Sequence, residues 1–375
     1  MRVEKNSGMK SLEIFNNNKR KLFFVPGVSQ VSTKAGKKVY RGSIFHRSRD
    51  FIQLYKIIEE KLKRIFKTNN RILVITSSGT GGMEACVCNF VNNNDCVLVI
   101  EGGKYGKRWT EILRSYNISP LRLELEWGKN ISPEFLEKYL KKINNLDVVF
   151  LTHCETSTGI LFDIETITRT IKKFFKCIII VDAISTLGTT ELNTDEWDLD
   201  VVVSVSQKGL LGPSGLSFLS VNYRALEKLK TGNLPKYYFD LKKYLEYAEK
   251  RQTPFTPGSI QLLYLKESLD FIEMFGIENV FGEIEKFASK FRDGLSKLGY
   301  TFFPESPASC ITVINVRKKP EEFINVLNEK HNVIVANGQG ILKDRVVRVS
   351  HIGLFTETQI EYLIDLFNKY RNLLI

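Results

Sequence analysis

The chain has 375 residues, 43% of them hydrophobic and 26% charged, which suits one large and one smaller folded unit. It lacks an apolar run of the roughly 18–20 residues that a membrane span needs, and its polar, basic N-terminus lacks the core of a signal peptide. The formal net charge is +12, but the lysines and arginines are interspersed with acidic residues, as in Glu59–Arg64. We therefore expect neither nucleic acid nor a membrane as a partner.

The cysteines and the densest basic segments exclude further classes of protein. Six cysteines at irregular spacing make neither a disulfide framework nor a zinc site, so we expect no metal and a cytoplasmic location. The basic segments Lys19–Lys21 and Lys34–Arg41 are short and match no nucleic-acid-reading motif. A non-enzymatic basic binding protein is nevertheless kept as an alternative.

Residues from about 50 to 260 alternate helix-like and strand-like patterns. We expect helices at 49–66, 82–91, 107–116, 133–142 and 164–175, and strands at 71–76, 96–100, 120–125, 148–153, 177–182 and 201–206. Short, nearly all-apolar strands separated by helices indicate a mostly parallel sheet covered on both faces. In such α/β sheets ligands lie beyond the carboxyl ends of the strands.

A second region follows the segment Pro254–Gly258. We expect helices at 259–275, 279–298, 320–330 and 357–372, and strands at 300–304, 309–316, 333–336 and 346–350. This pattern is typical of a small α+β domain. We therefore divide the chain into an N-terminal arm (1–24), a large domain (25–272) and a small C-terminal domain (273–375).

Two of the predicted strands end on charged side chains. The apolar run before Lys208 places an amine at the end of a buried strand, where an ammonium loses its hydration unless its charge is used or removed. A Schiff base with an aldehyde cofactor is one solution. The strand at 177–182 ends on Asp182. An amine and a carboxylate delivered to the same end of a sheet indicate a pyridoxal phosphate site.

A glycine-rich turn, Ser77–Gly82, connects the strand at 71–76 to the next helix. Free N–H groups and the helix dipole at such a turn favour an anion, and Ser78, Gly79 and Thr80 are the candidates. The turn has neither the glycine spacing of a dinucleotide fingerprint nor the Gly-Lys-Ser/Thr of a P-loop. An ordinary glycine-rich turn is the alternative interpretation.

Other candidates follow the neighbouring strands. Tyr105 lies between glycines at a strand end, where it either covers a cofactor ring or packs on the surface. The hydroxyl of Thr156 either donates to a phenolate oxygen or caps a helix. His153 is not taken as a general base, because a lone histidine at a strand end more often packs or orients its neighbours. Arg348 lies inside a strand, either as a carboxylate clamp or as a surface ion-pair partner like Arg345.

The motifs occur together in one order, and in that order they are similar to the class V aminotransferases. The matching motifs are Phe24–Gly27, His46–Ser48, Ser78–Gly81, Tyr105–Arg108, Thr152–His153 with Glu155–Gly159, Val181–Ala183, Ser206–Lys208, Gln252–Pro257 and Arg348–Gly353. These are pyridoxal phosphate enzymes of fold type I. The branch that the chain resembles contains the alanine–glyoxylate, serine–pyruvate and archaeal-type aspartate aminotransferases.

The resemblance implies a role for each matching residue. Lys208 would form the Schiff base with pyridoxal 5'-phosphate, and Asp182 would bond the pyridine nitrogen. The remaining cofactor contacts would come from Ser78, Gly79, Thr80 and Gln207 around the phosphate, Tyr105 on the ring, Thr156 at the ring hydroxyl, and Thr256 from the partner subunit. Arg348 would clamp the substrate carboxylate beside the backbone of Gly27.

The resemblance also implies an activity, an assembly and rival functions. The expected enzyme is a homodimer with active sites at the subunit interface, and it moves an amino group from a small amino acid to a 2-oxo acid such as glyoxylate or pyruvate by a ping-pong mechanism. A 2-aminoethylphosphonate–pyruvate transaminase is the alternative. A cysteine desulfurase is less expected, because Gln207 precedes Lys208 and Cys310 falls in an apolar strand pattern.

Overall fold

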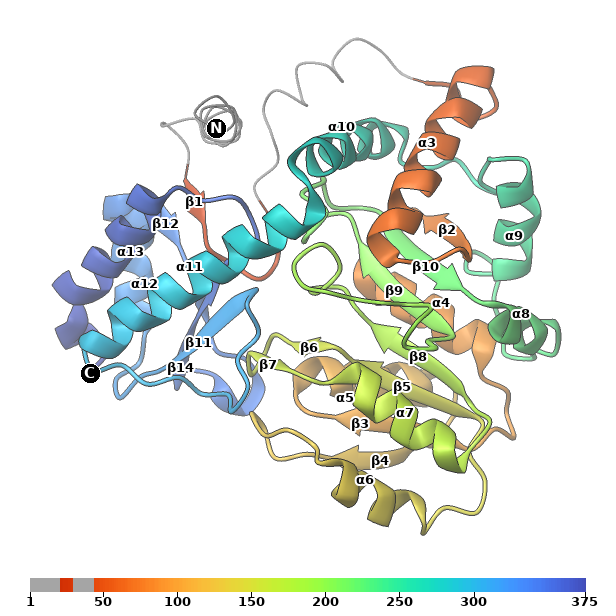
Figure 1. Cartoon of the computed structure of the whole chain (residues 1–375), viewed down its shortest axis with the longest axis horizontal. Helices are drawn as coiled ribbons and strands as arrows, with labels where there is room; N and C mark the ends of the chain where they lie inside the picture. Colours follow the sequence, from red (N-terminus) through yellow and green to blue (C-terminus); the bar gives the residue numbers. More distant parts are fainter. Residues whose placement is uncertain (1–20, 30–43) are drawn as a thin grey trace.

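The computed structural model describes residues 21–29 and 44–375. The segment Lys34–Arg41 and most of the expected N-terminal arm lie outside the described residues. Two regions of sheet and helix stand side by side in Figure 1, and the helices α10 (Ser259–Phe275) and α11 (Ile277–Lys297) run from one to the other.

The larger region is built on a seven-stranded sheet with the order β2-β10-β9-β8-β5-β3-β4. Its strands are β2 (Arg71–Ile75), β3 (Val97–Glu101), β4 (Leu121–Glu124), β5 (Val148–Thr152), β8 (Ile178–Asp182), β9 (Val201–Val205) and β10 (Ser217–Val221). The pairs from β9 to β4 are parallel, while β10 is antiparallel to both of its neighbours. This arrangement confirms the expected α/β fold with a mostly parallel sheet.

Helices cover this sheet on both faces because its central strands are apolar on both sides. The helices are α3 (Arg49–Phe66), α4 (Gly79–Phe90), α5 (Lys104–Ser115), α6 (Pro133–Leu140), α7 (Ile164–Phe174), α8 (Tyr223–Lys230) and α9 (Leu241–Glu249). In Figure 1, α7 lies in front of the sheet and α5 behind it. One continuous apolar core joins the strands to these helices.

The C-terminal region has a small antiparallel sheet with the order β11-β14-β13. Its elements are β11 (Ile311–Asn315), α12 (Glu321–His331), β12 (Val333–Ile334), β13 (Ala336–Asn337), η1 (Gly340–Leu342), β14 (Val346–Ser350), α13 (Glu357–Lys369) and η2 (Arg371–Leu373). The strand β1 (Leu22–Phe23) pairs with β12, and Phe24 is buried in the core of this region. The domain boundaries expected from the sequence stay a prediction.

Some expected elements differ from the structure. β10 and α8 were not expected, although β10 lies between β2 and β9. The strand expected at 300–304 is wrong, since only a single bridge from Phe302 to Ile314 forms there. The helices expected from 82 and 107 begin earlier, at Gly79 and Lys104, and so include glycine-rich turns that carry site residues.

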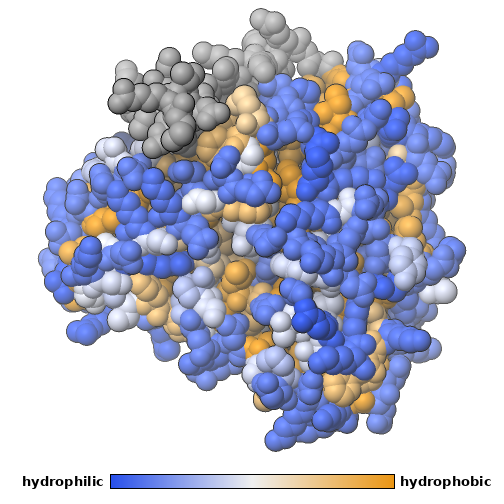
Figure 2. Space-filling view, in the orientation of Figure 1, coloured by the Kyte–Doolittle hydropathy of each residue, from blue (hydrophilic) through white to orange (hydrophobic). Residues whose placement is uncertain are grey.

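Polar residues cover most of the molecular face in Figure 2. Some large apolar side chains of the described residues are nevertheless exposed, among them Phe45 (65%), Tyr237 (73%), Ile260 (56%) and Met274 (71%). Among the described helices, none combines the length and the apolar character that a bilayer span needs.

Candidate active site

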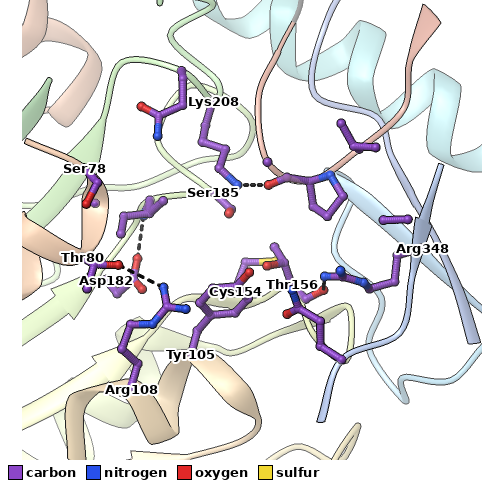
Figure 3. Close-up of a pocket in the computed structure, with 18 residues that line it drawn as sticks. Ser78, Thr80, Tyr105, Arg108, Cys154, Thr156, Asp182, Ser185, Lys208 and Arg348 are labelled. Atoms are coloured by element: carbon purple, nitrogen blue, oxygen red, sulfur yellow. Dashed lines mark hydrogen bonds between the residues drawn. The ribbon is translucent and has the colours of Figure 1, made fainter. Parts of the chain in front are cut away.

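A cavity of about 350 Å³ opens beyond the carboxyl ends of the central strands, at the junction with the C-terminal region (Figure 3). Its volume is within the range of about 300–1,000 Å³ typical of small-ligand sites. The lining residues are Val25, Pro26, Gly27, Ser78, Gly79, Thr80, Tyr105, Arg108, Cys154, Thr156, Asp182, Ile184, Ser185, Gln207, Lys208, Ala336, Gln339 and Arg348. The fold thus brings together every site residue expected from the sequence except Thr256.

Lys208 lies three residues beyond the end of β9 and points into the cavity (Figure 3). Its side chain is buried, and the Nζ atom donates a hydrogen bond to the carbonyl of Pro26. Burial lowers the pKa of Lys208 to about 8. About a tenth of its amines are therefore neutral and nucleophilic at pH 7, which is far more than for a solvated lysine.

Asp182 is the last residue of β8, next to β9 in the sheet. Its carboxylate is buried and accepts a hydrogen bond of 2.8 Å from the N–H of Ile184. Burial raises the pKa of Asp182 to about 7, because the nearby cations Arg108 and Lys208 offset the lost hydration only in part. A buried carboxylate of this kind favours a cationic partner such as a protonated ring nitrogen.

The glycine-rich turn opens α4 at the rim of the cavity. Ser78 is the N-cap, and its side chain accepts a hydrogen bond from the N–H of Gly81. Packing favours Gly79, since a Cβ there would lie 2.7 Å from Cδ1 of Ile184 and 3.1 Å from Cγ1 of Val205. This close contact sets the first turn of the helix, with its dipole, against the end of β9.

A cation completes this rim. Arg108 donates from Nη1 to Oγ1 of Thr80 over 3.2 Å, and its guanidinium carbon lies 4.8 Å from the ring centroid of Tyr105. Within the described part of the chain, Arg108 makes these contacts but no ion pair. Its position over the start of α4 suits a ligand with a strong negative charge. Sequence reasoning placed Arg108 in a motif but gave it no role.

Tyr105 is held by a buried carboxylate from another strand. The structure places Tyr105 in the first turn of α5, where a loop was expected. One oxygen of Glu155 accepts hydrogen bonds from the N–H groups of Tyr105 (2.8 Å) and Gly106 (2.9 Å), and the other accepts from Ser157. Glu155 lies in β6 (Cys154–Glu155), which pairs with β7 (Ile160–Leu161). The residue was quoted within a motif, but its positioning role was missed.

Arg348 reaches the cavity from β14, on the opposite side from Asp182 (Figure 3). It is 4% exposed, with Nε bonded to the carbonyl of Asn337 (2.8 Å) and Nη1 to that of Thr156 (3.2 Å). Backbone carbonyls thus orient the guanidinium and leave its charge without a carboxylate among the described residues. A surface ion pair, the alternative considered from the sequence, does not describe this buried arginine.

Two half-buried glutamines also line the cavity, and the side-chain oxygen of each lacks a hydrogen-bond partner. The Oε1 atoms of Gln207 and Gln339 are buried and have no hydrogen-bond partner within the described protein. Buried polar atoms without a partner are rare, so a bound molecule is a natural partner for both amides. Gln207 was expected at the site. Gln339 was missed, because nothing in its local sequence marks it as facing a cavity.

His153 and Thr256 differ from the residues at the cavity wall. His153 is buried next to Trp197, and burial lowers its pKa to about 4. It is therefore neutral at physiological pH, in line with the decision not to take it as the base. Thr256 is exposed and is absent from the cavity wall. Its predicted contact with the phosphate from a partner subunit stays a prediction.

Comparison with known proteins decides the family. The model of the family "Aminotransferase class-V" matches residues 27–363. This chain belongs to the class V aminotransferase family. Enzymes of this class use pyridoxal phosphate, so the expected family, cofactor and enzyme class are confirmed.

Several relatives of this class V aminotransferase span most of its length. An uncharacterized aminotransferase of Methanocaldococcus jannaschii is 35% identical over 91% of this chain and 90% of its own. A protein of Synechococcus sp. named soluble hydrogenase, small subunit, is 33% identical over 90% of both chains. An L-aspartate–glyoxylate aminotransferase of Paracoccus denitrificans is 27% identical over 89% of this chain and 87% of its own.

A solved structure shows the same fold. The alanine–glyoxylate aminotransferase of Nostoc sp. superposes with a TM-score of 0.89 at 24% identity, over 94% of this chain and 96% of that chain. The likeness covers both the seven-stranded sheet and the C-terminal antiparallel sheet. It confirms the expected fold type.

The residues present fit pyridoxal phosphate. The phosphate needs donors and positive charge, and the rim offers the first turn of α4, Thr80 and Arg108. The ring needs an acid for its nitrogen and an amine for its aldehyde, and Asp182 and Lys208 line the same cavity. The unpartnered amide of Gln207 supplies a further polar contact.

Proposed function

We propose that this class V aminotransferase moves an amino group from a small amino acid, of the alanine, serine or aspartate type, to a 2-oxo acid such as glyoxylate or pyruvate. The observation that carries the proposal is one cavity lined by Lys208 and Asp182 with Arg348 opposite them. An amine, an acid and a carboxylate-binding cation are the groups that amino transfer requires. The glyoxylate activity of the Paracoccus relative supports the choice of acceptor.

Each residue has a task in this reaction. Pyridoxal phosphate, when bound, supplies an electron-withdrawing ring that stabilises the charge left when an amino acid loses its Cα proton. Asp182, which is buried, would hold a proton on the ring nitrogen by ion pairing. Lys208 would hold the cofactor through its amine, and its Nζ atom would serve as the base that moves the proton away from Cα of the substrate.

Arg348 and Thr156 set the orientation of the substrate. The carbonyl of Thr156 fixes one nitrogen of the Arg348 guanidinium, which leaves its charge to bind the α-carboxylate. A carboxylate bound to Arg348, on the far side of the cavity from Asp182, would hold the substrate in the cavity that Lys208 enters. This orientation exposes the Cα–H bond to the amine that removes its proton.

We propose that the enzyme is a homodimer in which Thr256 of one subunit completes the phosphate site of the other. Exposed apolar side chains surround the segment that carries Thr256. Tyr237 packs on Phe255 with ring centroids 5.9 Å apart, and Ile260 follows on α10. An exposed apolar surface next to an incomplete phosphate site fits a second copy of the chain.

The test of the proposed function is a panel of amino donors against acceptors. Alanine, serine, aspartate and 2-aminoethylphosphonate are each paired with glyoxylate, pyruvate and 2-oxoglutarate, with Lys208→Ala as the inactive control. Turnover of a small amino acid with glyoxylate or pyruvate is expected. Turnover of 2-aminoethylphosphonate alone would instead establish the alternative transaminase. Release of sulfide from cysteine, without amino transfer, would contradict the proposal.

A further inference from the structure

Two buried cysteines meet at the junction of the two sheets. Cys154 begins β6, and Cys310 directly precedes β11 in the C-terminal region. Their Sγ atoms lie 3.6 Å apart, and both thiols are free. The fold alone brings the two residues together, because they are 156 positions apart in the chain. The proposed amino transfer uses neither sulfur.

The cavity gives a small molecule access to this pair. Cys154 lines the cavity wall, although it is only 5% exposed, and Cys310 lies behind it at 2% exposure. The cysteines Cys86, Cys88 and Cys177 are buried away from the cavity wall. A small oxidant that enters the site therefore meets Cys154 before any other buried thiol.

Two cations favour a negative charge on the inner sulfur. A hydrogen bond from Cys154 lowers the pKa of Cys310, and the charges of Lys208 and Arg292 lower it further. Arg292 lies in α11 and is bonded to the carbonyls of Ala308 (2.5 Å) and Ile311 (2.9 Å), on both sides of Cys310. Within the described residues, no carboxylate forms an ion pair with this half-buried guanidinium. Its charge is thus left to act on the thiol.

We propose that Cys154 and Cys310 form a redox-active dithiol that a peroxide converts into a reversible disulfide beside the active-site lysine. The contact of the two sulfurs and their place at the cavity wall carry the proposal. It does not depend on the proposed amino transfer. Only the expected effect on turnover does.

The chemistry balances with hydrogen peroxide as the oxidant. The hydrogen bond with Cys310 raises the pKa of Cys154, so Cys154 first passes its proton to the Cys310 sulfur. The Cys154 sulfur then attacks one peroxide oxygen, the O–O bond breaks, and the second oxygen takes the proton from Cys310 and leaves as water. Cys310 then attacks the sulfenic sulfur, the S–O bond breaks, and a second water leaves. Two thiols and one peroxide become one disulfide and two waters, so the sulfurs lose two electrons and the peroxide gains them.

Closing this bond changes the cavity wall. The sulfurs must approach from 3.6 Å to about 2.05 Å, which pulls Cys154 toward the C-terminal region. Thr156, two residues further along the chain, holds Arg348 in place. A displacement of about 1 Å at a reacting site can cost on the order of 100-fold in rate. We expect turnover of the oxidised enzyme to fall by about tenfold or more.

The test is peroxide treatment of the native holoenzyme, followed by alkylation of free thiols, proteolysis and mass spectrometry. A peptide pair joined through Cys154 and Cys310 is expected, lighter than the two free peptides by two hydrogens. Dithiothreitol is expected to separate the pair and to restore turnover. Detecting the joined peptides in the wild-type protein does not depend on the folding of any variant. The result remains informative even if the protein does not catalyse the proposed amino transfer.

Two cysteine variants test which thiols form the cross-link. Cys310→Ser removes the cross-link, whereas Cys96→Ser, a half-buried cysteine outside the cavity wall, leaves it in place. The absence of the joined peptides in native wild-type protein would overturn the proposal. Joined peptides in the Cys310→Ser variant would overturn it too, because Cys154 would then be pairing elsewhere. Unchanged turnover in fully cross-linked enzyme would overturn the inferred effect on the site.

Discussion

One carboxylate oxygen of Glu155 accepts hydrogen bonds from two successive N–H groups, those of Tyr105 at 2.8 Å and Gly106 at 2.9 Å. A side chain from β6 thus caps the first turn of α5 and fixes the aromatic ring at the cavity. Burial raises the pKa of Glu155, although its hydrogen bonds favour the charged form. Four hydrogen-bond donors hold the buried carboxylate in place: the N–H groups of Tyr105, Gly106 and Ser157, and the hydroxyl of Ser157.

The Glu155→Gln variant tests this positioning role. Its amide has one oxygen, so two of the four donors lose their acceptor, and the free energy of unfolding should fall by about 1–3 kcal/mol. Affinity for pyridoxal phosphate should weaken as Tyr105 loses its fixed position. The matched control is Glu111→Gln on the exposed face of α5, which should change stability by less than about 0.5 kcal/mol. Equal stability of the two variants in denaturant titrations would contradict the role of Glu155.

The pKa of about 8 for Lys208 predicts a pH dependence of cofactor capture by the apoprotein. The neutral amine is the reactive form, so the rate should rise with pH, by about tenfold per unit well below pH 8, and level off above it. A solvated lysine would instead continue to gain reactivity up to about pH 10. Stopped-flow absorption at a series of pH values measures this rate. A rise that continues to pH 10 would mean that burial does not control this amine.

Arg108 is expected to bind the cofactor through its phosphate. Removing a hydrogen bond to a charged group costs about 1.5–3 kcal/mol, so Arg108→Gln should weaken pyridoxal phosphate binding by about 10- to 100-fold. Binding of pyridoxal, which has no phosphate, should be unchanged. Arg108→Lys keeps the charge and should lie between, while Arg114→Gln, on the exposed face of the same helix, should match wild type. Equal weakening for pyridoxal and its phosphate would exclude a phosphate contact.

Arg348 is expected to govern substrate affinity. Arg348→Gln should raise KM for the amino donor by about 10- to 100-fold, because the α-carboxylate loses a charge-assisted partner. Arg348→Lys should show a smaller rise, which separates charge from misfolding. Arg345→Gln serves as the control, since Arg345 is exposed three residues earlier in the chain. Steady-state kinetics with an unchanged KM in Arg348→Gln would remove Arg348 from the site.

Much of the fold follows from local patterns. Buried strands such as Val201–Val205 are continuous apolar runs, and their ends locate Asp182 and Lys208 without any knowledge of the partners. β10 was missed, because Ser217–Val221 has serines among its apolar residues and follows a glycine-rich turn. Its strand identity comes from pairing with β2 and β9, which is information that lies outside the segment.

Site residues could be predicted where the residue type and its place at a strand end indicate the chemistry. They could not be predicted where contacts between distant parts of the chain determine the position of the side chain. Tyr105 belongs to a helix because Glu155, 50 residues away in the chain, caps that helix. Arg348 was expected in a strand, but only the fold shows that the strand faces the cavity. Gln339 faces the same cavity through a loop whose path no local pattern reveals.

The most direct test of the account is to locate the covalent attachment of the cofactor. The holoenzyme is reduced with borohydride, digested and sequenced by mass spectrometry, with Lys208→Ala treated in parallel. We expect pyridoxal phosphate fixed to Lys208 in the wild-type protein and no attachment in the variant. Attachment at another lysine, or none in a protein saturated with pyridoxal phosphate, would contradict it.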